Sequence, residues 1–198
     1  MHVNQLQVIQ YPNQPQTPND QTQWVKWFHH LVKNMPPKGD TWPWGYIHVR
    51  PAVAIVALDE SKKVVLVSQF RYPFGAEVIE IPKGFVKDGE APLDAAKREF
   101  KEEVRRVANQ WQSLGEIIAA PGIGKIVHHA FLAQELQELP PNKDAPALDD
   151  IEEPQEQLQV KWVSLDDFFD SVIQDVVIDA VTIAAIEKAK LYLRRANP

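Results

Sequence analysis

The stretch Gly84–Arg106, GFVKDGEAPLDAAKREFKEEVRR, decides how the rest of the chain is interpreted. Its first residues, rich in glycine and charge, predict a loop, and Pro92 suits the first turn of a helix, where its missing N–H group costs nothing. Apolar side chains then recur at helical spacing, at Leu93, Ala96, Phe100, Val104 and Val107. The stretch therefore predicts a loop that leads into an amphipathic helix.

This helix carries three carboxylates on one face. Glu99, Glu102 and Glu103 are related as i, i+3 and i+4, so their side chains are neighbours. Three negative charges this close repel one another, and a hard divalent cation with oxygen ligands offsets that repulsion. A solvated acidic face is the commoner fate of such a cluster. The loop and an arginine at fixed offsets favour a metal site instead.

These residues resemble the Nudix box, G-x5-E-x7-R-E-U-x-E-E-x-G-U, in which U is a bulky apolar residue. The matching positions are Gly84, Glu90, Arg98, Glu99, Phe100, Glu102 and Glu103. The resemblance implies an α/β (α+β) fold, the Nudix-type α/β/α sandwich with a mixed sheet, in a hydrolase domain over residues 46–198, preceded by an N-terminal arm over residues 1–45. It also implies metal-assisted hydrolysis of a nucleoside diphosphate linked to another moiety.

Two positions depart from the box. Arg105 stands where the family has a glycine in the left-handed conformation, which costs another residue roughly 1 kcal/mol. Either Arg105 accepts that strain, or the helix continues towards Asn109. Arg106 stands at an apolar position, where it could pair with Glu102 or Glu103 and weaken a metal site.

Other stretches resemble the ADP-ribose pyrophosphatases within this family. They are Gln69–Phe85, Asp179–Ala189 and the proline sixteen residues after the box glycine position, Pro121. By this resemblance, Glu99 and Glu103, with Glu102 sharing, and the main-chain carbonyl of Lys83 bind Mg²⁺, for which Mn²⁺ is a substitute. Glu103 thereby also counts as a catalytic residue, and Glu90 and Arg98 brace the loop against the helix.

In this subfamily the catalytic base lies on a late loop. Aligning QLQVKWVSLDDF by its strand pattern makes Glu156 the first candidate and Glu153 the second, with a solvated acidic loop as the alternative. Arg71 is a candidate for binding substrate phosphate, or else an arginine in solvent at a hairpin turn. Glu80 resembles a position near metal or substrate, with a solvent-facing strand carboxylate as the alternative. The pair His128-His129 lacks a third ligand at metal spacing and is interpreted as structural.

The N-terminal 45 residues form a polar arm with a large aromatic content. A strand is expected at Leu6–Ile9, a short aromatic helix at Gln23–Lys33 and a rigid turn at Thr41–Gly45. The aromatic side chains either pack on their own domain or form the interface of a homodimer. In a dimer, Trp42, Trp44 or Tyr46 could stack on a base bound by the partner.

Apolar runs predict the remaining elements. Strands are expected at Tyr46–Leu58, Val64–Phe70, Glu77–Ile81, Trp111–Ala119, Ile126–Gln134 and Leu158–Val163, and helices at Leu165–Val172 and Asp175–Arg195.

Composition narrows the function classes. The net charge of -6 argues against non-specific binding to nucleic acid or anionic membrane, and the absence of cysteine excludes disulfides and thiolate chemistry. Without a long apolar stretch or a signal peptide pattern, we expect a cytoplasmic protein that acts on a nucleotide-sugar type of small molecule. Two interpretations remain: an Mg²⁺-dependent pyrophosphohydrolase, favoured by the intact R-E-x-x-E-E, and a Nudix-fold nucleotide-binding regulatory module, favoured by Arg105 and Arg106.

Overall fold

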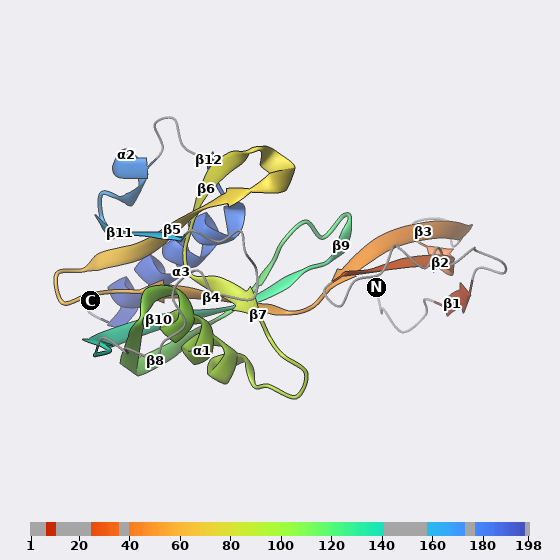
Figure 1. Cartoon of the computed structure of the whole chain (residues 1–198). Coiled ribbons are helices and arrows are strands. Elements are labelled where there is room, and N and C mark those ends of the chain that lie inside the picture. Colours follow the sequence, from red (N-terminus) through yellow and green to blue (C-terminus); the bar gives the residue numbers. More distant parts are fainter. Residues whose placement is uncertain (1–6, 11–24, 36–39, 141–157, 173–176, 197–198) are drawn as a thin grey trace. The chain divides into compact units, whose positions relative to one another are not determined.

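The computed structural model describes residues 7–10, 25–35, 40–140, 158–172 and 177–196 (Figure 1). The chain forms two compact units. The first comprises Met1–Arg50 and Ile118–Val127, and the second comprises Pro51–Ile117 and His128–Pro198.

Within the described residues, the second unit contains two four-stranded sheets. In the first sheet β4 is parallel to β10 and antiparallel to β7, in the order β7-β4-β10-β8. In the second, β5 is antiparallel to β11 and β6, and β6 is parallel to β12, in the order β11-β5-β6-β12. The strands are β4 (Ala52–Ala57), β5 (Lys63–Arg71), β6 (Ala76–Glu80), β7 (Lys83–Phe85), β8 (Arg106–Ile118), β10 (Val127–Glu138), β11 (Gln159–Ser164) and β12 (Val177–Ile178).

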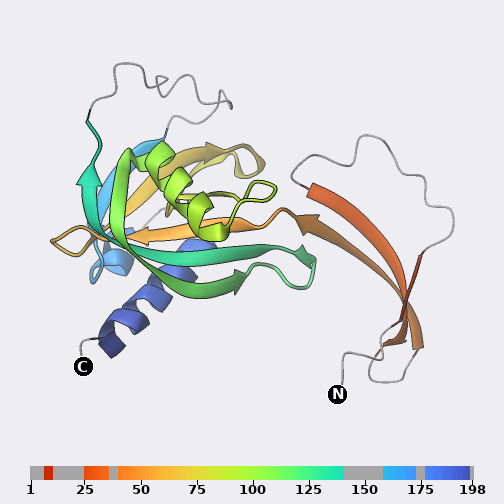
Figure 2. The same cartoon turned by 90° about the horizontal axis from the view of Figure 1, so that it is seen from below.

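Helices pack against β4 from both sides, which confirms the predicted α/β/α arrangement. Side chains of α1 (Pro92–Val104) form one buried cluster with alternate residues of β4, namely Val53, Ile55 and Ala57. The intervening residues of β4 are also buried and point to the opposite face, which α3 (Ala180–Ala196) covers. Figure 2 shows α1 and α3 on different sides of these strands. This explains why β4 is a continuous apolar run.

The helix α1 ends where the box predicts, in spite of the missing glycine. Arg105 takes the left-handed conformation, with φ 55° and ψ 37°, and its N–H donates to the Lys101 carbonyl at 3.1 Å. The alternative in which the helix continues to Asn109 is therefore wrong, because β8 begins at Arg106. Val107 lies in this strand and not on the helix.

Both helices near the C-terminus begin later in the chain than the sequence predicts. The helix α2 (Phe168–Val172) follows a turn in which the Asp167 N–H donates to Ser164 Oγ at 3.4 Å. Within the part expected to be helical from Asp175, residues 177–178 are strand β12, and α3 begins only at Ala180. Asp179 accounts for this start, because its Oδ1 accepts the N–H groups of Val181 and Thr182. Among the helices that the structure describes, none is long and apolar enough to cross a membrane.

The described part of the first unit contains a four-stranded sheet in the order β1-β2-β3-β9. It comprises β1 (Gln7–Gln10), β2 (Val25–Met35), β3 (Asp40–Val49) and β9 (Gly124–Lys125), so a strand near Leu6–Ile9 is confirmed. The expected aromatic helix is wrong, because β2 occupies the described part of it. The expected turn at Thr41–Gly45 is also wrong, because that segment lies within β3.

Cross-strand pairing explains both errors. Phe28 lies opposite Tyr46, with their rings stacked 5.1 Å apart, and His30 lies opposite Trp44. Aromatic residues are enriched in strands, where cross-strand pairs of this kind stabilise the sheet. Pro43 is tolerated because, in the described sheet, β3 pairs with β9 only at Ile47 and His48 and is an edge strand elsewhere.

Candidate active site

The loop-helix stretch is built around close contact between Gly84 and Glu99. Gly84 lies in β7 opposite Val53 of β4. A Cβ atom at Gly84 would collide with the carboxyl group of Glu99, which occupies the space beside the glycine backbone. Only glycine therefore lets this helix carboxylate reach the main chain that follows the Lys83 carbonyl.

Arg98 fastens the loop to the helix. Its Nε and Nη2 donate to Glu90 Oε1 and Oε2, both at 2.9 Å, and Nη2 also donates to the Phe85 carbonyl at 3.0 Å. Glu90 in turn accepts the Lys87 N–H at 2.9 Å. The hydrogen bond from Arg98 lowers the pKa of Glu90 to about 2. The expected bracing role of Glu90 and Arg98 is confirmed.

Arg98 also holds two of the three helix carboxylates. Its Nη1 lies 2.6 Å from Glu99 Oε1 and 3.2 Å from Glu102 Oε2. Burial raises the pKa of Glu99, and the hydrogen bond from Arg98 opposes that rise. This guanidinium therefore compensates much of the negative charge that the spacing of the glutamates creates.

Arg106 does not compete for these carboxylates. It pairs with Glu138 of β10, and its guanidinium lies 4.7 Å from the ring centroid of Trp162. The expectation that Arg106 pairs with Glu102 or Glu103 is therefore wrong. An arginine fits this position because its planar head stacks on an aromatic ring of β11.

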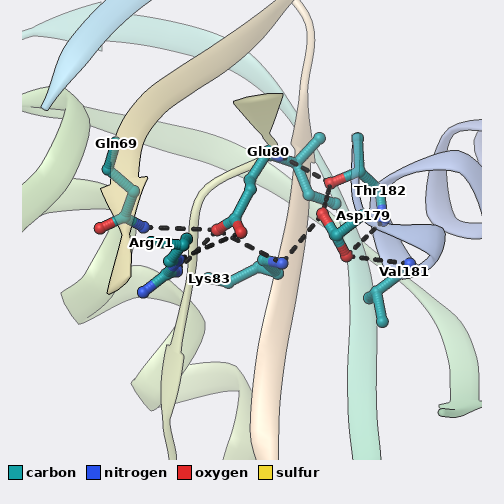
Figure 3. Close-up of polar contacts among 8 residues, drawn as sticks. Gln69, Arg71, Glu80, Lys83, Asp179, Val181 and Thr182 are labelled. Carbon is teal, nitrogen blue, oxygen red and sulfur yellow. Dashed lines mark hydrogen bonds and ion pairs between the residues drawn. The ribbon is translucent and has the colours of Figure 1, made fainter. Parts of the chain in front are cut away.

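Arg71 and Glu80 lie together on the hairpin of β5 and β6 (Figure 3). Arg71 donates from Nε to Glu80 Oε1 at 3.2 Å and from Nη2 to Glu80 Oε2 at 2.7 Å. Gln69 Nε2 donates to the same carboxylate at 3.3 Å. Glu80 is only 4% exposed, so the alternative of a solvent-facing carboxylate is wrong.

Two residues near the last helix extend this group. Lys83 Nζ lies 3.4 Å from Glu80 Oε2 and 3.0 Å from Asp179 Oδ2, and Thr182 Oγ1 donates to the same oxygen of Asp179. Burial alone would raise the pKa of Asp179, but the Lys83 ammonium and the Thr182 hydrogen bonds outweigh it and lower that pKa. Sequence reasoning missed Asp179 and Thr182. Their only local signal is an aspartate directly before a helix.

A comparison with known protein families identifies the family of this chain. The profile described as the NUDIX domain matches residues 48–184. The chain belongs to the Nudix family.

Two curated relatives match this Nudix hydrolase over more than two thirds of its length. It is 34% identical over 140 residues to the ADP-ribose pyrophosphatase of Bacillus subtilis, covering 71% of this chain and 72% of the relative. It is 27% identical over 155 residues to the methanol dehydrogenase activator of Bacillus methanolicus, covering 78% and 80%. A crystal structure of an ADP compounds hydrolase has a TM-score of 0.70 at 18% identity, covering 97% of this chain and 93% of the other. The last likeness supports the fold.

The donor groups of the box fit a divalent cation. Glu99, Glu102 and Glu103 and a main-chain carbonyl are hard oxygen donors, and the Gly84 backbone leaves room for Glu99 beside that carbonyl. Within the described ranges, no three His, Cys, Asp or Glu side chains are already gathered around one point. The contacts of Glu99 and Glu102 with Arg98 explain this, because both carboxylates are turned towards the guanidinium.

Glu153, Glu156 and His128 are also singled out in the sequence. Glu153 and Glu156, the candidates for the base, lie outside the described residues. His128, at the start of β10, is largely buried, and its Nδ1 has no hydrogen-bond partner in the part of the chain that the structure describes. Burial, and then the Lys83 ammonium, lowers the pKa of His128 to about 4.

Proposed function

We propose that this Nudix hydrolase cleaves the pyrophosphate bond of ADP-ribose or a related nucleotide sugar, with Mg²⁺ as its cofactor and Mn²⁺ as a substitute. The observation that carries the proposal is the contact of Glu99 with the Gly84 backbone, next to the intact Arg98–Glu90 clamp. The likeness to the ADP-ribose pyrophosphatase of Bacillus subtilis over most of both chains supports the substrate class.

The proposed metal ligands are the carboxylates of Glu99, Glu102 and Glu103 and the carbonyl of Lys83. When bound, Mg²⁺ would neutralise charge on the phosphate oxygens and lower the pKa of a bound water. In the reaction a water oxygen bonds to phosphorus, and the bond from phosphorus to the bridging oxygen breaks. The chain has to bring the substrate, the ligands and a base together for this exchange.

Arg71 is the proposed phosphate-binding residue. Its side chain is 36% exposed, and Glu80 orients the guanidinium through two hydrogen bonds. Arginine forms bidentate hydrogen bonds with phosphate oxygens, and a guanidinium that is already oriented loses less side-chain entropy when it does so. We propose that Glu156, or otherwise Glu153, accepts the proton of the attacking water.

The experiment is an assay of the full chain on ADP-ribose, ADP-glucose, UDP-glucose and GDP-mannose, with Mg²⁺, with Mn²⁺ and with EDTA. Chromatography should detect AMP and ribose 5-phosphate from ADP-ribose only when a divalent cation is present. Unchanged ADP-ribose in the Mg²⁺ and Mn²⁺ samples would contradict the proposal.

A regulatory Nudix protein is the second candidate. The methanol dehydrogenase activator of Bacillus methanolicus matches 78% of this chain, and Arg105 departs from the box in a strained conformation. Under this alternative the chain would bind a nucleotide sugar without cleaving it. Calorimetry of ADP-ribose binding with Mg²⁺ present, alongside the chromatographic assay, separates binding without turnover from catalysis.

We also propose that the chain is a homodimer that uses its first unit. In that unit Trp42 and Trp44 are 58% and 40% exposed and lie on the face of the sheet that carries Phe28 and Tyr46, whereas Trp27, 54% exposed, lies on the other face. The aromatic rings paired across β2 and β3 would then meet the partner, and Trp42, Trp44 or Tyr46 would approach its substrate. Light scattering at micromolar concentration should give twice the chain mass, and the variant Trp42→Ser/Trp44→Ser should shift it towards the monomer.

A further inference from the structure

A closed circuit of polar contacts ties the start of α3 to the residues before the box glycine (Figure 3). Lys83 Nζ lies 3.0 Å from Asp179 Oδ2, and Thr182 Oγ1 donates to that same oxygen. The Thr182 hydroxyl also accepts the N–H of Ile81 at 3.0 Å. The circuit thus leads from Lys83 through Asp179 and Thr182 back to Ile81, two residues before its starting point.

Burial makes this circuit a fixed part of the molecule. Thr182 is fully buried and Glu80 nearly so, and the side chains of Lys83 and Asp179 are 13% and 21% exposed. Two carboxylates face the one ammonium, because Glu80 Oε2 lies 3.4 Å from Lys83 Nζ on its other side. A charge held in this way has few alternative positions, since moving it away would leave the partly buried Asp179 carboxylate without its ammonium partner.

The contacts of this circuit lie next to the peptide bond between Lys83 and Gly84. Neighbouring residues of a strand point to opposite faces, so the Lys83 side chain reaches Asp179 while Gly84 meets Glu99 of α1. The Lys83 carbonyl belongs to the peptide that joins these two contacts. Pairing of β7 with β4 fixes one side of this segment, and the Thr182 hydroxyl fixes Ile81 just before it.

We propose that Asp179 and Thr182 are positioning residues for divalent-cation binding: through Lys83 and Ile81 they orient the Lys83 carbonyl beside the Glu99 carboxylate. The inference rests on the proposed function in one respect, the role of that carbonyl as a metal ligand. It adds residues of the last helix and its cap, which are distant in the chain, because 101 positions separate Ile81 from Thr182. Groups that orient metal ligands typically change metal affinity 10–100-fold when they are altered.

The variant Asp179→Asn tests this role with little change in shape. The amide oxygen can still accept the N–H groups of Val181 and Thr182, at 2.9 and 3.2 Å in the parent, so the start of α3 stays capped. The negative charge that faces Lys83 is lost. We expect the dissociation constant for Mn²⁺, measured by electron paramagnetic resonance of the free ion, to rise about tenfold.

Glu187→Gln is the matched control. Glu187 belongs to the same helix and pairs with Lys190 at 3.5 Å, outside the circuit. This variant also removes one negative charge from α3, so it should bind Mn²⁺ as the parent does. An equal weakening in both variants would show a general electrostatic effect and overturn the positioning role.

A double-mutant cycle tests whether Asp179 affects Mn²⁺ binding through the Lys83 ammonium. Lys83→Met keeps the main-chain carbonyl but removes the ammonium, and it should weaken Mn²⁺ binding to a similar extent. If Asp179 acts through this ammonium, Lys83→Met/Asp179→Asn binds Mn²⁺ no more weakly than the weaker single variant. Multiplicative effects would overturn the route through Lys83. If circular dichroism shows that Asp179→Asn does not fold, the Mn²⁺ affinity of Lys83→Met alone still tests the role.

The outcomes separate this inference from the proposed reaction. If Asp179→Asn binds Mn²⁺ as tightly as the parent, or the parent binds none, the positioning role is wrong. If the parent binds Mn²⁺ and Asp179→Asn binds it about tenfold more weakly, the role holds. It then holds even if neither protein hydrolyses a nucleotide sugar, a result that would contradict only the proposed reaction.

Discussion

Two charged clusters lie against strand β7, and they differ in how their charges balance. On the α1 side, one guanidinium, that of Arg98, contacts the carboxylates of Glu90, Glu99 and Glu102. On the α3 side, Arg71 contacts Glu80, and Lys83 contacts both Glu80 and Asp179. The first cluster keeps an excess of negative charge that a divalent cation can offset, whereas the second is neutral by itself. The proposed ligand site therefore lies in the cluster with excess negative charge, and the proposed positioning residues lie in the balanced one.

The largest effect should come from removing one charge on the unbalanced side. Glu103→Gln is isosteric and should leave the fold intact, but it removes a proposed anionic ligand. We expect turnover of ADP-ribose to fall by more than about 100-fold, beyond the usual cost of altering a residue that only orients a ligand. Parent-like turnover at saturating Mg²⁺, with an unchanged circular dichroism spectrum, would show that Glu103 is not a ligand.

A methyl group at the box glycine, Gly84, should disrupt the cluster on the α1 side by steric collision. Gly84→Ala places a Cβ where the Glu99 carboxyl group lies, so that carboxylate has to move away from the strand. We expect activity to fall roughly 10–100-fold, with little loss of stability because Gly84 does not have a positive φ. Gly122→Ala is the control, since a Cβ there meets nothing within 4 Å. If both variants were equally active, the contact between Glu99 and Gly84 would not be required for activity.

His128, which lies beside the balanced cluster, should make the free energy of unfolding depend on pH. His128 faces Lys83, Asp179, Glu80 and His129, and its pKa falls from 6.5 to about 4, chiefly through burial. A depressed pKa means that the folded state prefers the neutral ring, so this stabilisation is complete above pH 6.5 and is lost as the pH falls towards 4. The loss at pH 4 should reach about 3 kcal/mol.

His128→Gln isolates this contribution. Glutamine does not titrate, so urea unfolding of the variant should show a shallower decline between pH 6.5 and 4 than the parent. Parallel curves for the two proteins would mean that His128 does not carry the pH dependence, and carboxylates would then account for it.

The smallest effect concerns the end of α1. Arg105 holds the left-handed conformation that glycine adopts without strain, so Arg105→Gly should stabilise the fold by roughly 1 kcal/mol. The hydrogen bond from its N–H to the Lys101 carbonyl involves only main chain and should persist. Urea unfolding measures the change, and a decrease in stability would mean that the arginine side chain contributes more than its backbone strain costs.

Prediction from the sequence succeeded where the contacts are local. The clamp of Arg98 on Glu90 joins residues 8 positions apart, and a helix sets the offsets of Glu99 and Glu102 from the arginine. It failed in the N-terminal unit because Trp27, Phe28 and Leu31 fit a helical stripe as well as a strand, and the choice depends on pairing with β3. Local sequence could not supply that pairing energy.

The sequence by itself determined the family, the loop-helix stretch and its excess of carboxylates, because spacing along one helix fixes which side chains are neighbours. Only the tertiary structure decided the rest: Arg106 stacks on Trp162, the N-terminal aromatics lie on strands, and Asp179 reaches Lys83. These contacts join residues distant in the chain, and their strength comes from burial and pairing that exist only after the strands and helices have packed.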